Sequence, residues 1–263
     1  PRGVDTRIVP RREGGEVLVD DLLAHADDST KMIAVSWVGY ASGYRINISE
    51  LVDRAHQQGI LVFLDAIQGR GVYPLDLKET PVDFLAADGH KWLLGPEGLG
   101  AAMIAKRHVE TLRCGNVGWN SVKNSHNYAK PELDLRSTAV RFEPGSANMV
   151  GAAALSESVE LFLKVRRAHG PESIANRVIG LAEQLDRELS HLGAITRLPT
   201  DRAARSGILT FEIPDVDPAV VRRRGLEEKV VLSVRDGGVR ASIHAYNDEQ
   251  DLARLVEVVR SVL

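Results

Sequence analysis

Two short segments place chemically useful side chains directly after apolar runs. Asp65 follows the apolar run 60–64, and Lys91 follows the run 83–87 within Asp88-Gly89-His90-Lys91-Trp92. A lysine at the end of a buried strand is costly unless it is paired, exposed or used in chemistry. Burial lowers the pKa of an amine, so such a lysine can attack an aldehyde and form a Schiff base. Taken alone, Asp65 could equally be a turn or capping residue, and Lys91 a surface residue.

The elements around these segments alternate between strand and helix patterns. Residues 47–59 have helical spacing, with Asn47 or Ser49 as the cap and Gly59 as the stop. Apolar or β-branched runs typical of strands cover residues 32–38, 60–64, 84–87 and 100–105. This alternation predicts an α/β fold with a mostly parallel sheet. In such a sheet ligands bind beyond the carboxyl ends of the strands, which is where Asp65 lies.

The pattern changes after about residue 196 and predicts a small α+β domain. We expect a large domain over residues 1–170 and a small C-terminal domain over residues 171–263, with the boundary inside a long helix at 171–192. An irregular segment, 106–145, precedes another helix that starts near Met149. The elements expected in the small domain are a half-buried strand at 208–213, strands at 230–234 and 238–243, and a last helix capped by Asn247 and Gln250.

Composition excludes several classes of protein. With 44% hydrophobic and 26% charged residues and a formal charge of −3, the 263-residue chain has the balance of a soluble globular protein. It has no basic footprint for nucleic acid, and no apolar run approaches the length of a membrane span. The single cysteine, Cys114, excludes an intramolecular disulfide and suits a reducing compartment. We therefore expect a cytoplasmic protein with neither a nucleic-acid nor a membrane partner.

Together the two segments resemble the core of fold-type I pyridoxal-phosphate (PLP) enzymes, specifically the class V aminotransferase superfamily. That superfamily includes cysteine desulfurases, selenocysteine lyases, kynureninases and isopenicillin-N epimerases. The matching residues, which agree in order and spacing, are Leu64–Gly69, Val82–Leu85, Gly89–Lys91 and Gly95–Gly98. The resemblance runs from about Val4 to the C-terminus and lacks the family's N-terminal third. We therefore expect a fragment, a proteolytic product or a truncated gene product.

The resemblance implies a role for each residue of the two segments. Lys91 would hold PLP through a Schiff base and then act as general base and acid at the substrate Cα. Asp65 would pair with the pyridinium nitrogen, and Gln68 would hydrogen-bond the ring 3′-oxygen. His90 would lie beside the cofactor phosphate. Desulfurases usually have serine at Asp88; an ionised aspartate repels phosphate, so we expect Asp88 to turn toward His90 or backbone amides.

Three later residues complete the implied site. Ser146, within Arg141–Asn148, matches a hydroxyl that reaches the neighbouring subunit's phosphate in a homodimer; it could also simply cap the helix near Met149. Gly118-Trp119 resembles the kynureninase-like loop whose indole N–H meets that phosphate. Arg240, within Val239–Asn247, matches the arginine that binds the substrate α-carboxylate; the alternative is a structural ion pair. The resemblance implies no metal ion.

Between Val230 and Arg240 there is no cysteine, although desulfurases carry their nucleophilic thiol shortly before this arginine. Persulfide chemistry is therefore disfavoured, and Cys114 is expected to be incidental. The leading expectation is an aminotransferase or epimerase-like reaction on an amino acid. The alternatives are a lyase of the selenocysteine lyase, kynureninase or cysteine desulfurase type, and a truncated non-catalytic dimerisation or interaction module.

Overall fold

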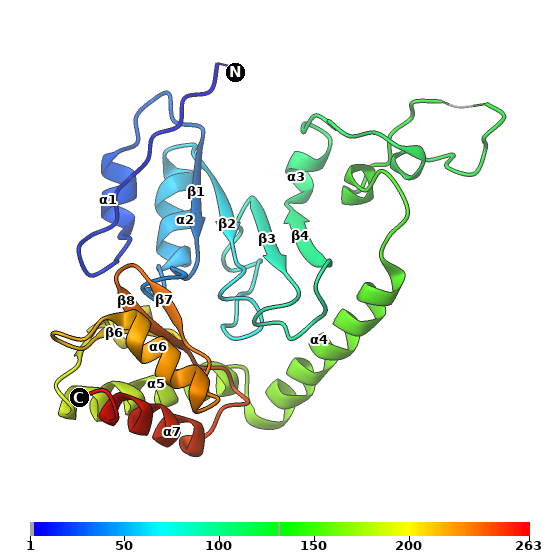
Figure 1. Ribbon diagram of the computed structural model, residues 1–263. Coiled ribbons are helices and arrows are strands. Elements are labelled where there is room, and N and C mark those ends of the chain that lie inside the picture. The colour runs from blue at the N-terminus through cyan, green and yellow to red at the C-terminus, as the bar shows by residue number, and fades with distance from the viewer. Residues whose placement is uncertain (1–2, 131) are drawn as a thin grey trace.

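The computed structural model describes residues 3–130 and 132–263, and its larger sheet has four strands (Figure 1). The first three strands are parallel, and the fourth pairs antiparallel with the third. The expected α/β fold with a mostly parallel sheet is thus confirmed. In spatial order the strands are β1 (Met32–Ser36), β2 (Leu61–Asp65), β3 (Phe84–Asp88) and β4 (Gly100–Ile104).

The helix between β1 and β2 forms as its sequence predicts. α2 (Ile48–Gln57) begins at Asn47, whose side chain accepts a hydrogen bond from the Glu50 N–H at 3.2 Å. Its apolar residues are buried, and Gly59 follows its end with φ of 70°. The preceding α1 (Val19–Ala24) lies beside it in Figure 1. β2 is not buried on both faces, because its alternate residues Leu61 and Phe63 are only half-buried.

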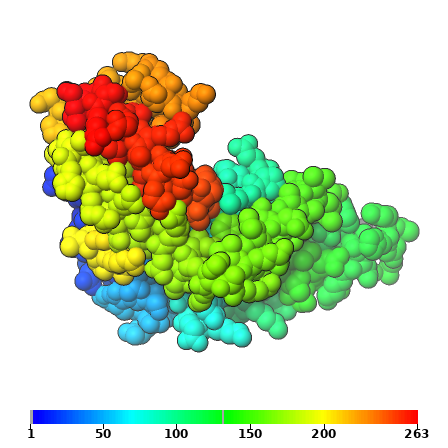
Figure 2. Space-filling view, turned by 90° about the horizontal axis from the view of Figure 1, so that it is seen from below, coloured from blue at the N-terminus to red at the C-terminus, as the bar shows by residue number. Residues whose placement is uncertain are grey.

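The chain between α3 (Lys106–Val109) and α4 (Met149–His169) projects away from the sheet (Figure 1). It contains two short 3-10 turns, η1 (Trp119–Ser121) and η2 (Ala139–Phe142). In the space-filling view this green part of the chain extends to one side, away from the red C-terminal helix (Figure 2). The cap of α4 is Asn148, which accepts from the Gly151 N–H at 2.9 Å. The expectation that Ser146 caps this helix is therefore wrong: Ser146 lies two residues before the cap, and Asn148 takes the N–H.

The C-terminal part of the chain forms a second, antiparallel sheet beside the first. One strand is shorter than expected: in place of the predicted strand at 230–234, only β7 (Ser233–Arg235) forms. No helix among the described residues is long and apolar enough to cross a membrane. The spatial order is β5 (Ile195–Thr196), β6 (Ile208–Glu212), β8 (Gly238–Ser242) and β7 (Ser233–Arg235), with η3 (Arg202–Ala204), α6 (Pro218–Glu227) and α7 (Glu249–Arg260) around it.

Two expectations from the sequence are wrong for the elements of this smaller sheet and the helices around it. β6 is buried on both faces rather than half-buried, because helices cover one face and the loop after β1 covers the other; the Thr210 hydroxyl donates to the Ala41 carbonyl at 2.5 Å. The cap of α7 is Asp248 with Asp251, not Asn247 with Gln250. An ionised carboxylate satisfies the first N–H groups of α7 and its positive end.

The helix α5 (Ser173–His191) belongs to both hydrophobic cores. Its first half, from Ile174 to Ile179, joins the core of the larger sheet. Its second half, from Leu181 to Leu189, joins the core of the smaller sheet. The helix is therefore shared by the two cores, and the proposed domains, 1–170 and 171–263, remain a prediction.

Candidate functional site

The carboxyl ends of the parallel strands bring Asp65 beside Ser36. The register pairs Ser36, Asp65 and Ala86 across β1, β2 and β3. The Asp65 carboxylate accepts from the Ser36 hydroxyl at 2.9 Å and from the Ile67 N–H at 3.0 Å. The second bond is that of an ordinary turn aspartate, but the side chain remains half-buried with unused lone pairs. Asp65 is thus an oriented carboxylate at the switch from strand to loop, where ligands bind in such sheets.

Gln68 is joined to the loop after β3 through Trp92. Gln68 is 8% exposed and Trp92 is 6% exposed. The Trp92 indole N–H donates to the Gln68 Oε1 at 2.6 Å. The sequence pointed to Gln68 but not to Trp92, which directly follows the candidate lysine. The hydrogen bond therefore holds the loops carrying Asp65 and Lys91 side by side.

Lys91 lies three residues beyond β3 in a tight turn. The turn is held by backbone bonds from the Gly89 N–H to Leu99 and from the Gly95 N–H to Gly89, both 2.8 Å. Contrary to the burial expected of a strand-end lysine, Lys91 is exposed, because it sits in the loop rather than in the sheet. No carboxylate pairs with it within residues 3–130 and 132–263. Its amine is thus available for chemistry.

His90 and Asp88 lie next to each other beside this turn. The His90 Nδ1 is 3.9 Å from the Asp88 Oδ2, and both side chains are accessible to solvent. Asp88 thus turns toward His90, one of the two orientations expected for it. The imidazole of His90 is exposed, as Lys91 is, and its contact with a phosphate stays a prediction.

Arg240 approaches the strand ends of the larger sheet from β8. Its Nη1 donates to the carbonyl of Tyr40, just beyond β1, at 2.7 Å. Burial, together with the charge of Arg235, lowers the pKa of the guanidinium. Its Nε is buried and has no partner among the described residues, and no carboxylate pairs with it there. Among the described residues, Arg240 therefore forms no structural ion pair, which was the alternative role considered for it.

Ser146 and Trp119 lie together on the projecting segment rather than with the other candidates. The Asn120 N–H donates to the Pro144 carbonyl at 3.2 Å, which places the two segments side by side. Both residues are exposed. No hydrogen bond in the described ranges joins either side chain to Asp65 or Lys91. Their role at a phosphate of a second subunit therefore stays a prediction.

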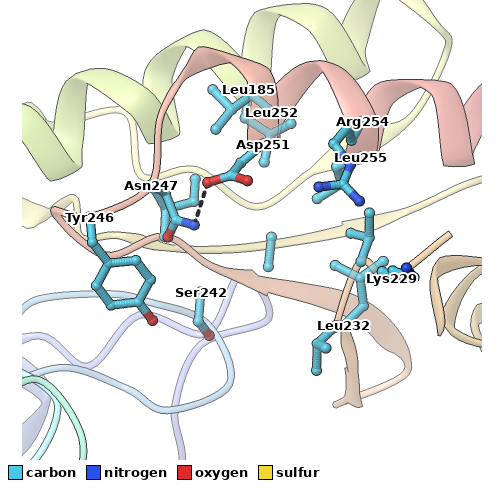
Figure 3. A pocket seen from close by; sticks show the side chains of 14 residues that line it. Leu185, Lys229, Leu232, Ser242, Tyr246, Asn247, Asp251, Leu252, Arg254 and Leu255 are labelled. Carbon is cyan, nitrogen blue, oxygen red and sulfur yellow. Dashed lines mark hydrogen bonds between the residues drawn. The ribbon is translucent and has the colours of Figure 1, made fainter. Parts of the chain in front are cut away.

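A separate hollow lies in the small domain between β8 and α7 (Figure 3). Its wall includes Ser242, Tyr246, Lys229 and Arg254, and an Asn247–Asp251 hydrogen bond of 2.9 Å crosses one end. None of the seven candidate residues lines it. The chemistry therefore points to the strand ends of the larger sheet, not to this hollow.

Known proteins resemble the chain over nearly its whole length. A probable cysteine desulfurase of Methanothermobacter thermautotrophicus is 28% identical over 99% of this chain and 68% of the relative. A kynureninase of Geobacillus thermodenitrificans is 25% identical over 97% of this chain and 60% of the relative. The apo structure of a cysteine desulfurase from Thermococcus onnurineus NA1 shares the fold, with a TM-score of 0.86 at 22% identity, covering 97% of this chain and 65% of that one.

The family model described as aminotransferase class-V matches residues 1–255. The match includes every candidate residue named from the sequence and extends through the β8 strand that carries Arg240. The relatives above are longer, and the chain spans 60 to 68% of their length. Because the model covers almost the entire chain, the chain belongs to the class-V aminotransferase family of fold-type I, PLP-dependent enzymes.

Proposed function

We propose that the chain carries much of the site of a PLP-dependent lyase that acts on an amino acid. The observation that supports it is the grouping of Asp65, Gln68 and Lys91 on adjoining loops, with Arg240 reaching the same edge from the small domain. The aminotransferase or epimerase-like reaction, which was the leading expectation from the sequence, is not confirmed. Relatives named cysteine desulfurase and kynureninase favour the lyase alternative.

The donor set at the strand ends fits PLP. The Asp65 carboxylate suits a protonated ring nitrogen, and the Lys91 amine has no carboxylate partner among the described residues. The Gln68 Oε1 already accepts a hydrogen bond from Trp92. The N–H groups of the Gln68 amide are therefore the ones available to donate to a ring oxygen. When bound, PLP supplies an electron sink for the electrons of a bond to the substrate Cα.

The chain's own residues then have distinct tasks. Arg240 binds the substrate carboxylate through Nη2 and the remaining proton of Nη1, since one Nη1 proton already serves Tyr40. Asp65 holds a proton on the ring nitrogen, which keeps the electron sink effective. Lys91 takes the Cα proton, and the released electron pair expels a leaving group from Cβ. The identity of that leaving group distinguishes one lyase substrate from another.

A nucleophilic thiol has no place in this proposal. Asp236 and Gly237, with φ of 55° and 78°, form the two-residue turn between β7 and β8. Arg11 and Arg197 both bind the Asp236 carboxylate and hold the turn. The Cys114 thiol instead donates to the Arg141 carbonyl at 3.1 Å on the projecting segment. We therefore propose elimination of a β-substituent without a protein persulfide.

A substrate panel tests this proposal. The PLP-loaded protein is incubated with cystine, cysteine, selenocysteine, kynurenine and alanine, and the cleaved β-substituent is measured. We expect a cleaved β-substituent from cystine, cysteine or selenocysteine, and an unchanged rate in Cys114→Ser. Cleavage of kynurenine alone would contradict elimination, because its acyl group cannot leave with the bond electrons. Keto acid formation from alanine without cleavage of any other substrate would restore the aminotransferase interpretation. Sulfide release from cysteine that is lost in Cys114→Ser would overturn the thiol-free mechanism, and no spectral response to any amino acid would favour the non-catalytic module.

Replacement of Arg240 by lysine should weaken amino-acid binding. Lysine keeps the charge but loses the two parallel donors, so affinity should fall by roughly 2 kcal/mol if one charge-assisted hydrogen bond is lost. Titration with amino acids, followed by visible absorption of the PLP-loaded protein, measures the change. Arg235→Lys is the matched control, because Arg235 is exposed and its Nη1 donates to the carbonyl of the adjacent Val234 at 2.8 Å. Equal affinity in Arg240→Lys and the wild type would remove Arg240 from the site.

A further inference from the structure

Trp92 makes one hydrogen bond toward the candidate cofactor site and one toward the small domain. Its indole N–H donates to the Gln68 Oε1 at 2.6 Å, and its backbone carbonyl lies 3.2 Å from the His244 Nε2. An indole nitrogen can only donate. The atom of Gln68 that faces Trp92 must therefore be the amide oxygen, and the amide NH2 must face the other way.

The second bond fixes the state of His244. The Ala245 N–H donates to the His244 Nδ1 at 2.8 Å, so this nitrogen carries no proton. The Nε2 must then carry the proton and donate it to the Trp92 carbonyl. Burial lowers the pKa of His244, which agrees with a neutral ring. His244 is thus a neutral donor that holds the backbone of Trp92.

Aromatic packing restricts the indole ring as well. The rings of Trp92 and His244 are stacked with centroids 5.0 Å apart, and Phe162 contacts His244 edge-on at 6.2 Å. Gly207 lies against the ring, since a Cβ there would come within 2.9 Å of a Trp92 ring carbon. Trp92 is therefore held at three places: His244 and Gly207 contact its ring, Gln68 accepts from its N–H, and His244 donates to its carbonyl.

We propose that Trp92 is a positioning residue that fixes the Gln68 amide so that only N–H groups face the cofactor ring. This inference rests on the proposed function, because it assigns a task toward PLP. The reason is geometric: a side-chain amide alone can present either its oxygen or its nitrogen, and the two differ as partners of a ring oxygen. Trp92 removes that choice, and His244 keeps Trp92 in place. The conformation of Gln68 is thus set before any ligand arrives.

The first test needs no cofactor. In the full chain labelled with ¹⁵N, three tryptophans give three indole signals, and Trp92→Phe identifies one of them. Gln68→Met removes the acceptor and should move the Trp92 signal upfield with faster hydrogen exchange. Gln68→Glu keeps an acceptor oxygen and should leave the bond in place. An unchanged Trp92 signal in Gln68→Met would refute the proposal, whether or not the chain binds PLP.

The second test uses the PLP-loaded protein. Trp92→Phe keeps an aromatic ring for His244 but removes the N–H, so the Gln68 amide is free to turn. Without a fixed donor, the ring oxygen holds the proton of the Lys91 linkage more strongly. The midpoint of the change in visible absorption with pH should therefore rise, by up to about one pH unit for one hydrogen bond.

Trp37→Phe is the control for loss of a buried tryptophan. Trp37 is 4% exposed and packs edge-on against Tyr73, with centroids 5.9 Å apart. This variant should keep the wild-type midpoint. A rise in Trp92→Phe alone supports the proposal, whereas equal midpoints in all three proteins would overturn it. If no variant takes up PLP, the proposed function fails and the indole signals alone decide the role of Trp92.

Discussion

Replacement of Lys91 by arginine is expected to abolish covalent attachment of PLP and to lower turnover by at least about 100-fold. Arginine keeps the positive charge of this exposed position but cannot form the linkage, and its guanidinium stays protonated and cannot take the Cα proton. Borohydride reduction followed by peptide mass spectrometry measures the attachment. The wild type should carry one pyridoxyl group, on Lys91.

Lys78→Arg is the control for this experiment. Lys78 is likewise exposed, but it lies in the loop between β2 and β3 and not at the candidate turn. It should label and turn over as the wild type does. Labelling of a lysine other than Lys91 in the wild type, or undiminished turnover of Lys91→Arg, would end the assignment of Lys91.

The largest expected effect on stability is that of Asp83→Asn. Asp83, immediately before β3, has a fully buried side chain. Burial alone would raise the pKa of Asp83, but its hydrogen bonds outweigh burial and lower the pKa to about 2. The donors are the Val62 N–H at 2.8 Å, His56 at 2.9 Å, His108 at 2.6 Å and Arg107 at 2.5 Å.

An amide at this position cannot accept all four donors, because one end of it is itself a donor. The free energy of unfolding at pH 7 should therefore fall by about 3 kcal/mol, the scale for removing one partner of a buried ion pair. Urea unfolding followed by circular dichroism measures this change. Asp134→Asn, which breaks the exposed pair with Lys123, is the control and should unfold as the wild type does.

The difference between wild type and Asp83→Asn should also depend on pH. A carboxyl whose pKa is lower in the folded than in the unfolded state stabilises the fold above the unfolded pKa, near 4, and loses this effect as the pH falls toward the folded pKa of about 2. The lowering corresponds to about 2 kcal/mol. Between pH 7 and pH 3 the difference in unfolding free energy should therefore stay constant down to about pH 4 and then shrink by roughly 1 kcal/mol by pH 3. A constant difference over that range would contradict the ionised state of Asp83.

The sequence was sufficient for the larger sheet because its signals are local. β2 ends at Asp65, directly after the apolar run 60–64, and Asn47, one of the two caps that the sequence offered, caps α2. Order and spacing of the motifs also identified the family, which the match over residues 1–255 confirms. These features depend on residues close together in the chain, so neighbours in the sequence determine them.

Choices between adjacent residues required the structure. Asn148 rather than Ser146 caps α4, and Asp248 rather than Asn247 caps α7. Both alternatives have suitable side chains one or two residues apart, and only the path of the chain into the helix decides between them. The burial of β6 on both faces likewise depends on Ala41, which is 169 residues away from Thr210.

The sequence by itself determined the family, the α/β class and the identity of Asp65, Gln68, Lys91 and Arg240 as candidates, because each lies in a short motif. Only the tertiary structure decided how these residues meet. The contact of Arg240 with Tyr40 spans 200 residues, and the bond of Trp92 to Gln68 joins loops that follow different strands. Such contacts form where parallel strands end at one edge of a sheet and a second domain packs against that edge. A local sequence pattern cannot predict which distant side chain will lie there.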